Sequence, residues 1–179
     1  ALRFGTVYGF SSRIRFDVVI NMLCGLALTT SKVTLNSNGE AWRPHLHIED
    51  ACESFRCCID WNPNIGELTI LNVGQNEDNF QVIDIAKIIH SNVENSELTY
   101  LSGSKDSDGS DLVKDRKIQD GVDKRSYRVS FDKIHSVLPN FNCHWSVEKG
   151  IKNLLNELIK LDLDRATFNK RDPEPHVGS

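Results

Sequence analysis

Hydrophobic residues recur along the chain with two different periods, and together these predict helices that alternate with strands. Spacings of three and four residues predict amphipathic helices near residues 17–27, 50–61, 82–89, 130–138 and 146–163. Short runs rich in β-branched and aromatic residues predict strands near residues 2–8, 32–35, 67–73, 98–100 and 126–129. This alternation predicts the α/β fold class.

Polar residues stand at the predicted helix starts, where they are expected to act as N-caps. Asp17 precedes the first helix, Asp78 or Asn79 precedes the third, and Ser146 precedes the last. A side-chain oxygen at such a position accepts a hydrogen bond from the free N–H groups of the first turn.

The predicted elements fill residues 1–163, which we take as one unit. Residues 102–120 are rich in Gly, Ser, Asp and Lys, which predicts a flexible loop, and residues 164–179 are expected to form a loose tail. The first strand has no earlier strand to pair with, and a parallel sheet this small would have open edges. We therefore expect the chain to be the C-terminal portion of a longer protein.

The composition narrows the class of protein. Hydrophobic residues make up 39% of the chain and charged residues 26%, as in soluble globular proteins. A net charge of -4 without a basic run argues against nucleic-acid binding. No segment approaches the ~20 apolar residues of a membrane helix. Five cysteines without a C-x-x-C pair favour reduced thiols over disulfides or zinc, and hence a cytoplasmic protein.

Arg43 stands between Trp42 and Pro44, at the start of a short strand that ends before Glu49 and Asp50. Such stiff neighbours limit the freedom of the arginine. Its guanidinium could pair with Glu40 or Asp50 at the surface, an interaction worth little. It could also bind paired phosphate oxygens, which match its fork-shaped set of donors.

Two histidines and two acids follow on the same strand. His45 and His47 are two residues apart, so both face one side of the strand. We favour packed, hydrogen-bonded histidines over zinc ligands, because no third ligand is evident, and we predict no metal site. Glu49 and Asp50 either cap the next helix or form an acid pair.

Arg125 and Tyr127 share one face of the last predicted strand, whereas Arg128 points the other way, so only one of these arginines can reach a given pocket. The glycines of Gly5–Gly9 do not form G-x-G-x-x-G, and no phosphate-binding loop occurs anywhere in the sequence. The residues themselves therefore carry no dinucleotide signature.

Five segments, taken in order, resemble a known family. They are LRFGTVYG (2–9), RIRFDVVIN (13–21), GEAWRPHLHIEDA (39–51), LNVG (71–74) and DKRSYRVSFDKI (123–134). Together they resemble the C-terminal half of an extended short-chain dehydrogenase/reductase, specifically the NAD-dependent epimerases and dehydratases that act on nucleotide sugars. The resemblance implies the C-terminal part of a Rossmann-like NAD(P)-binding fold plus a small mixed α/β substrate-binding subdomain.

The resemblance also implies residues near the cofactor and the base. Gly5 and Thr6 would lie beside the nicotinamide and the reacting sugar, although many members have asparagine where Thr6 stands. Asn21 would contact the diphosphate. Leu35, and with it Val33, would pack against the nucleotide base.

Two arginines would form the main anion contact under this resemblance. Arg43 would grip the diphosphate of a nucleoside diphosphate sugar, Arg125 would supply the second cationic contact, and Tyr127 would support it. Two guanidinium groups would balance about two negative charges. Intact members of the family usually dimerise, so a homodimer is expected of the intact protein.

The family's catalytic parts lie upstream of the equivalent of Leu2, so no catalytic residue is expected in this chain. Tyr100 and Lys105 are one residue too far apart for Tyr-x-x-x-Lys, and Phe131 stands four residues after Tyr127. In the intact protein the tyrosine would move a proton while NAD, or NADP, takes and returns hydride. We expect the isolated chain to hold no cofactor firmly and to have no turnover.

Two other functions remain open at this point. A reductase of the same superfamily could act on a small carbonyl compound without a nucleotide, and it would not need two arginines. A non-enzymatic binding module could have kept the fold and lost the chemistry.

Overall fold

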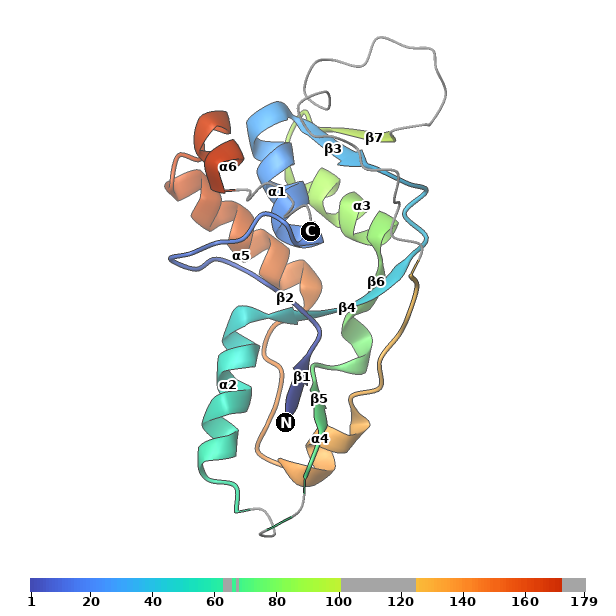
Figure 1. Cartoon of the computed structure of the whole chain (residues 1–179). Coiled ribbons are helices and arrows are strands. Elements are labelled where there is room, and N and C mark those ends of the chain that lie inside the picture. Colours follow the sequence, from blue (N-terminus) through green and yellow to red (C-terminus); the bar gives the residue numbers. More distant parts are fainter. Residues whose placement is uncertain (63–65, 67, 101–124, 172–179) are drawn as a thin grey trace, which may run out of the picture.

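The computed structural model describes residues 1–62, 66, 68–100 and 125–171, in which strands and helices alternate (Figure 1). The strands are β1 (Leu2–Phe4), β2 (Thr6–Tyr8), β3 (Lys32–Leu35), β4 (Trp42–His47), β5 (Leu71–Val73), β6 (Asn79–Gln81) and β7 (Glu97–Tyr100). The helices are α1 (Val19–Thr30), α2 (Ile48–Ile59), α3 (Val82–Asn92), α4 (Asp132–Val137), α5 (Val147–Lys160) and α6 (Arg165–Arg171), with a 3-10 turn η1 (Asn76–Asp78).

The strands form three small sheets. β1 pairs with β5 and β3 pairs with β7, both in parallel, and β4 lies between parallel β2 and antiparallel β6. The single strand predicted over residues 2–8 is divided at Gly5, where an added Cβ would lie 3.2 Å from the Pro44 carbonyl oxygen. Parallel pairs between helical segments confirm the α/β class.

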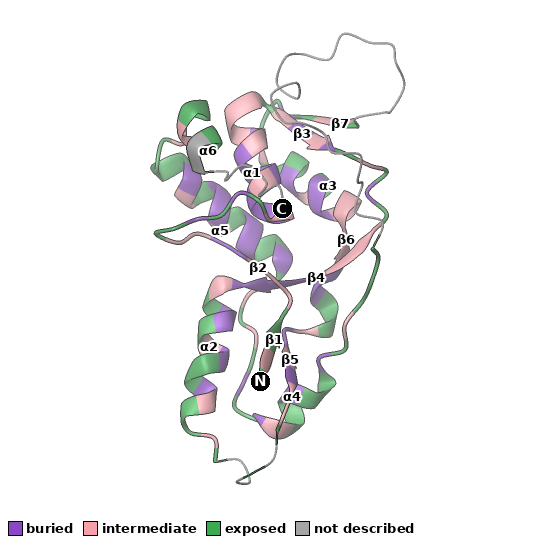
Figure 2. Cartoon of the chain, viewed as in Figure 1, coloured by how far each residue is buried: buried purple, intermediate pink, exposed green. Residues whose placement is uncertain are grey.

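Two hydrophobic cores lie at opposite ends of the molecule (Figure 2). The first packs α1, α3 and α5 over β3, and its fully buried members include Phe16, Ile20, Leu23, Val33, Ile85, Ile89, Ile151, Leu154 and Leu158. The second lies between α2, α4 and β5 and includes Leu46, Leu71, Val73, Ile134 and Phe141. β4 lies between the two cores: Leu46 belongs to the second, whereas His45 and His47 on the other face of the strand pack against Tyr8 of the first.

The helix caps differ from several predictions. Ser146 caps α5 as expected, since its hydroxyl accepts a hydrogen bond from the Lys149 N–H at 3.3 Å. Asp17 does not cap α1, which begins after Val18; its carboxylate instead binds Arg15. The third helix, α3, follows Gln81 without a side-chain cap, because Asp78 and Asn79 belong to η1 and β6.

Residues 165–171 are more ordered than predicted. Residues 164–179 do not form a loose tail throughout, because α6 places Phe168 at 1% exposure against Phe16, with ring centroids 4.7 Å apart. The sequence pattern of this short helix is too brief to show a period. The loop predicted at 102–120 lies outside the described residues. Within the described part of the chain, no helix combines the length and apolar character needed to span a membrane.

Candidate functional site

Arg43 lies at the start of β4, half-buried, with its guanidinium turned toward residues 125–127. Its Nη1 donates hydrogen bonds to the Trp42 carbonyl oxygen at 2.8 Å and to the Arg125 carbonyl oxygen. The guanidinium carbon lies 5.3 Å from the centre of the Tyr127 ring. Folding therefore brings Arg43 and Arg125 together although 82 positions separate them in the sequence.

Residues 125–129 run alongside the first residues of β4 without forming a regular strand. The Tyr127 N–H donates to the Trp42 carbonyl at 3.2 Å, and the Trp42 N–H donates to the Ser126 hydroxyl at 3.1 Å. Arg128 stacks on the Trp42 ring at 4.7 Å. Arginine and aromatic side chains thus alternate across this contact, and each cation–π pair at such an exposed site contributes about 0.5–1 kcal/mol.

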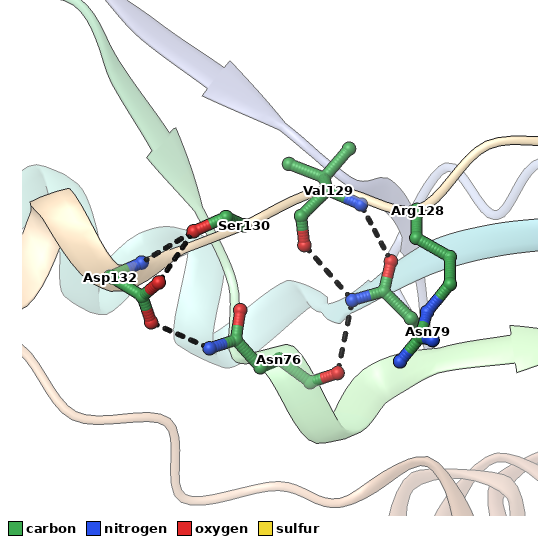
Figure 3. A pocket seen from close by; sticks show the side chains of 6 residues that line it. All are labelled: Asn76, Asn79, Arg128, Val129, Ser130 and Asp132. Carbon is green, nitrogen blue, oxygen red and sulfur yellow. Dashed lines mark hydrogen bonds between the residues drawn. The ribbon is translucent and has the colours of Figure 1, made fainter.

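Two asparagines hold the next residues of this segment (Figure 3). The Asn79 amide donates to the Val129 carbonyl at 3.0 Å and accepts from the Val129 N–H at 2.9 Å. The Asn76 amide accepts from the Phe131 N–H at 2.9 Å and donates to Asp132 at 2.6 Å. An open pocket of about 440 Å³ lies here, lined by Asn76, Asn79, Arg128, Val129, Ser130 and Asp132.

Asn76, Asn79 and the stacked Arg128 are not predicted as site residues from the sequence. Residues 76–79 have the composition of an ordinary polar loop, and side-chain amides in loops are common. The available signal is their spacing: Asn76 begins η1 and Asn79 directly follows it, and two residues three positions apart in such a turn lie on the same side. Their partners lie 50 or more positions later, which no local pattern reveals.

Asn21 has a structural task in the described geometry. Its side chain is buried at 3% exposure, its oxygen accepts from the Gly9 N–H at 3.0 Å, and its amide nitrogen donates to the Arg15 carbonyl at 2.8 Å. These bonds fix the turn after β2, where Gly9 has a φ of 123°. A contact between Asn21 and a diphosphate stays a prediction.

The predicted base-stacking residues face the first core. Val33 is 0% exposed and Leu35 is 3% exposed, both packed beneath α1 and α3. A nucleotide base could not lie on these side chains without opening the core, because interiors are close-packed. The alternation of β3 instead exposes Lys32 and Thr34 partly to solvent, so the geometry does not favour this part of the prediction.

Gly5 and Thr6 lie where β1 passes into β2. Thr6 is opposite His45 in the register, and the Gly5 N–H donates to the Val73 carbonyl at 3.4 Å. The small size of Gly5 is explained by the nearby β4 backbone. Among the described residues these two alone do not build a cradle for a dinucleotide, and no chemical step that involves NAD follows from their geometry.

His45 and His47 face the same side of β4, as predicted, and both pack against Tyr8, with ring centroids 6.3 and 5.4 Å apart. His47 also stacks on Trp145 at 4.1 Å, and its Nδ1 accepts from the Glu49 N–H, so His47 is the N-cap of α2. Both nitrogens of buried His45 lack a hydrogen-bond partner, which corrects the expectation of a hydrogen-bonded histidine. Within the described ranges no cluster of His, Cys, Asp or Glu suits a metal ion.

The acids Glu49 and Asp50 do not cap α2, which His47 caps, and each accepts hydrogen bonds from the loop before α5. Asp50 is 1% exposed, and its two oxygens accept from the backbone N–H groups of His144 and Trp145 at 2.9 and 3.1 Å. Glu49 accepts from the Trp145 indole N–H at 3.0 Å. Both acids therefore attach the loop before α5 to the start of α2.

Replacing His45 with phenylalanine is expected to make the protein less sensitive to acid. Burial, helped by the charge of Arg43, lowers the pKa of His45 to about 4 from an ordinary value of 6.5. Well above pH 6.5 the imidazole is neutral in both the folded and the unfolded protein, so its titration does not change the free energy of unfolding. Below pH 6.5 the unfolded chain binds the proton first, so stability falls, by about 2 kcal/mol at pH 5.

Urea unfolding at pH 8 and pH 5 measures this effect. The drop in unfolding free energy between the two values should be about 2 kcal/mol smaller in His45→Phe than in the unchanged protein. An equal drop in both proteins would show that His45 is not held neutral by burial.

Comparison with solved structures gives the class of fold. An epimerase from Methanothermobacter thermautotrophicus matches with a TM-score of 0.70 and 20% identity over 94% of this chain and 44% of that chain. A UDP-glucose 4-epimerase from Thermotoga maritima, with UDP-glucose, matches at 0.66 and 17%, over 90% and 46%. A UDP-glucuronic acid 4-epimerase from Bacillus cereus, with UDP-glucuronic acid and NAD, matches at 0.64 and 20%, over 89% and 45%.

These matches show that the chain has the fold of part of the epimerases to which it is similar, and this is consistent with the expected C-terminal half. The chain spans less than half the length of each of these structures. The expected resemblance and fold class are thus confirmed at the level of fold. Neither a family model nor a curated protein matches the sequence.

Proposed function

We propose that this chain carries the site that recognises a nucleoside diphosphate sugar in an NAD-dependent epimerase or dehydratase. The observation that carries the proposal is the meeting of Arg43 and Arg125 at the edge of β4, with Tyr127 beneath the Arg43 guanidinium. In this proposal both arginines bind the diphosphate, for which bidentate guanidinium donors are suited. The similar solved structures that contain UDP-sugars support this ligand class.

The local structure limits the motion of Arg43. Its hydrogen bonds to two carbonyl oxygens and its contact with Tyr127 fix one side of the guanidinium. Pro44, which is buried, restricts the backbone next to it. A preorganised cation loses less side-chain entropy on binding than a free one, and this favours affinity for a multiply charged anion.

In this proposal the chain recognises the substrate and does not itself catalyse the reaction. The 179 residues include no Tyr-x-x-x-Lys pair and no Gly-rich dinucleotide loop. Proton transfer and hydride transfer would depend on parts that these residues do not supply. We further propose that the intact protein works with NAD as a homodimer in the cytoplasm.

Replacing Arg43 with alanine is expected to weaken binding of UDP-glucose or UDP-glucuronic acid about tenfold, because one charge-assisted contact to the diphosphate is lost. Titration calorimetry on the full chain measures the two dissociation constants. Arg56→Ala is the matched control: Arg56 is an exposed arginine on α2 that pairs with Glu53 at 2.5 Å.

A second titration series with UMP separates diphosphate recognition from base recognition. Arg43→Ala should reduce the affinity for UDP-sugars more than the affinity for UMP, which lacks the second phosphate. Equal binding of UDP-sugars by the unchanged protein and Arg43→Ala would refute the arginine clamp. If the protein bound a panel of ligands without preference for those that contain a diphosphate, a reductase of small carbonyl compounds would be favoured.

A further inference from the structure

Asn79 connects two parts of the proposed site that are distant in sequence. It begins β6, where it lies opposite Pro44 of β4 in the antiparallel register, and Phe80 lies opposite Arg43. Its amide faces the other way, onto Val129, four residues after Arg125. One residue therefore contacts both the strand that bears Arg43 and the segment that bears Arg125.

The Asn79 side-chain amide makes the hydrogen bonds that the backbone of a neighbouring strand would otherwise make. It donates to the Val129 carbonyl and accepts from the Val129 N–H, the pair of bonds that a strand residue would make. Its second amide hydrogen is donated to the Asn76 carbonyl at 3.0 Å. With 8% exposure, the side chain is nearly shielded from water, and only a group with both a donor and an acceptor satisfies these partners.

We propose that Asn79 is a positioning residue for diphosphate recognition: its amide holds residues 125–129 against β4 and so keeps Arg125 and Tyr127 next to Arg43. This inference rests on the proposed function. Beyond Val129 the segment is held by other groups, because Asn76 binds Phe131 and Asn72 donates to the Ser130 carbonyl at 3.2 Å. Before Val129 the segment keeps its bonds to Trp42 and Arg43. Loss of the Asn79 amide should therefore loosen the arginine end of the segment against β4 and leave the fold in place.

Asn79→Asp tests this with almost no change in shape. An ionised carboxylate cannot donate, and it would face the carbonyl oxygens of Asn76 and Val129. A protonated carboxyl would restore one donor and keep one acceptor. Asn79 is nearly as shielded from water as Asp78, whose pKa is raised by burial, so burial should also favour the protonated form of an acid at position 79.

We expect Asn79→Asp to bind UDP-glucose about tenfold more weakly than the unchanged protein at pH 8, and this ratio to shrink at pH 5.5. Calorimetry on the full chain at both pH values gives the ratio. Asn92→Asp is the control, since Asn92 is exposed at the end of α3 and its amide donates to Ile88 within the same helix. The dissociation constant of Asn92→Asp for UDP-glucose should equal that of the unchanged protein at both pH values.

Hydrogen exchange without ligand provides the second readout. The amides of Tyr127 and Val129 should exchange faster in Asn79→Asp at pH 8, and those of α5 should not. Weaker binding that recovers at pH 5.5, together with faster exchange of the Tyr127 and Val129 amides alone, would support the positioning role of Asn79.

Three outcomes would contradict either the positioning role of Asn79 or the proposed function, and the measurements distinguish them. Unchanged affinity and unchanged exchange in Asn79→Asp would overturn the positioning role and leave the proposed function standing. An equal loss of affinity at both pH values, with faster exchange throughout the chain, would also overturn it, because Asn79 would then act only on overall stability. Failure of the unchanged protein to bind UDP-glucose or UDP-glucuronic acid would overturn the proposed function itself.

Discussion

Replacing Gly150 with alanine is expected to lower the free energy of unfolding by about 3 kcal/mol, the upper part of the range for overpacking a core. Gly150 lies in the first turn of α5, directly against Tyr8. A Cβ at this position would lie 2.2 Å from the Tyr8 hydroxyl oxygen and 2.7 Å from Cε2 of the ring. Real Cβ atoms do not approach other atoms so closely, so the helix or the ring must move.

Two opposing effects decide the sign of this prediction. Alanine favours a helix over glycine by about 1 kcal/mol, which on its own would stabilise the variant. The Tyr8 ring, however, is 1% exposed and packs edge-on against His45 and His47, so it has no space into which to move. We expect the steric cost to exceed the helical gain because a planar ring cannot bend away.

Thermal and urea unfolding of Gly150→Ala would measure the loss. Asn156→Ala, at an exposed position of the same helix, is the control and should be neutral or slightly stabilising. In a Tyr8→Leu background, Gly150→Ala should cost less than it does in the unchanged protein, because the shorter side chain leaves space for the added methyl group. If Gly150→Ala is as stable as the unchanged protein, the close contact between α5 and β2 is wrong.

The elements that the sequence predicts well are those in which local pattern and burial agree. The helix predicted at 50–61 is α2 (Ile48–Ile59), and the one predicted at 146–163 is α5 (Val147–Lys160). In α5 the buried residues recur every three or four positions and Ser146 provides the cap. Such signals depend on neighbouring residues, so they can be recognised in the sequence alone.

The features that escape prediction depend on distant partners. Asp50 has the sequence position of a helix cap, yet its carboxylate binds N–H groups 94 and 95 residues away. Val33 and Leu35 are implied as base contacts by the resemblance, but the helices packed over β3 bury them. The approach of Arg125 to Arg43 is expected only from the resemblance, because a spacing of 82 residues leaves no local trace.

Removal of the Asp50 carboxylate has the second large effect that we predict. Asp50 lies in the first turn of α2, and its two oxygens are the acceptors for the N–H groups of His144 and Trp145. Through these bonds it fixes the loop that carries Trp145 onto His47 and leads to the Ser146 cap of α5. One buried side chain thus joins α2 to the start of α5.

Asp50→Ala is expected to lower the free energy of unfolding by about 3 kcal/mol, since two part-buried N–H groups lose their acceptor and an unsatisfied N–H costs about 1–3 kcal/mol. Burial raises the pKa of Asp50, and removing a carboxylate that is costly to bury offsets part of this loss. Asp50→Asn keeps one acceptor, so its loss should be smaller than that of alanine.

Asp84→Ala controls for the position within the helix, because Asp84 also lies in a first turn, that of α3, but is partly exposed and paired with Lys87 at 3.2 Å. Its removal should cost below about 1 kcal/mol, the combined effect of a surface ion pair and the helix dipole. Urea unfolding of the three variants gives the order directly. If Asp50→Ala and Asp84→Ala lower the free energy of unfolding equally, the Asp50 carboxylate does not hold α5 to α2. The bonds to His144 and Trp145 would then add nothing to stability beyond the effect of a surface acid in the first turn of a helix.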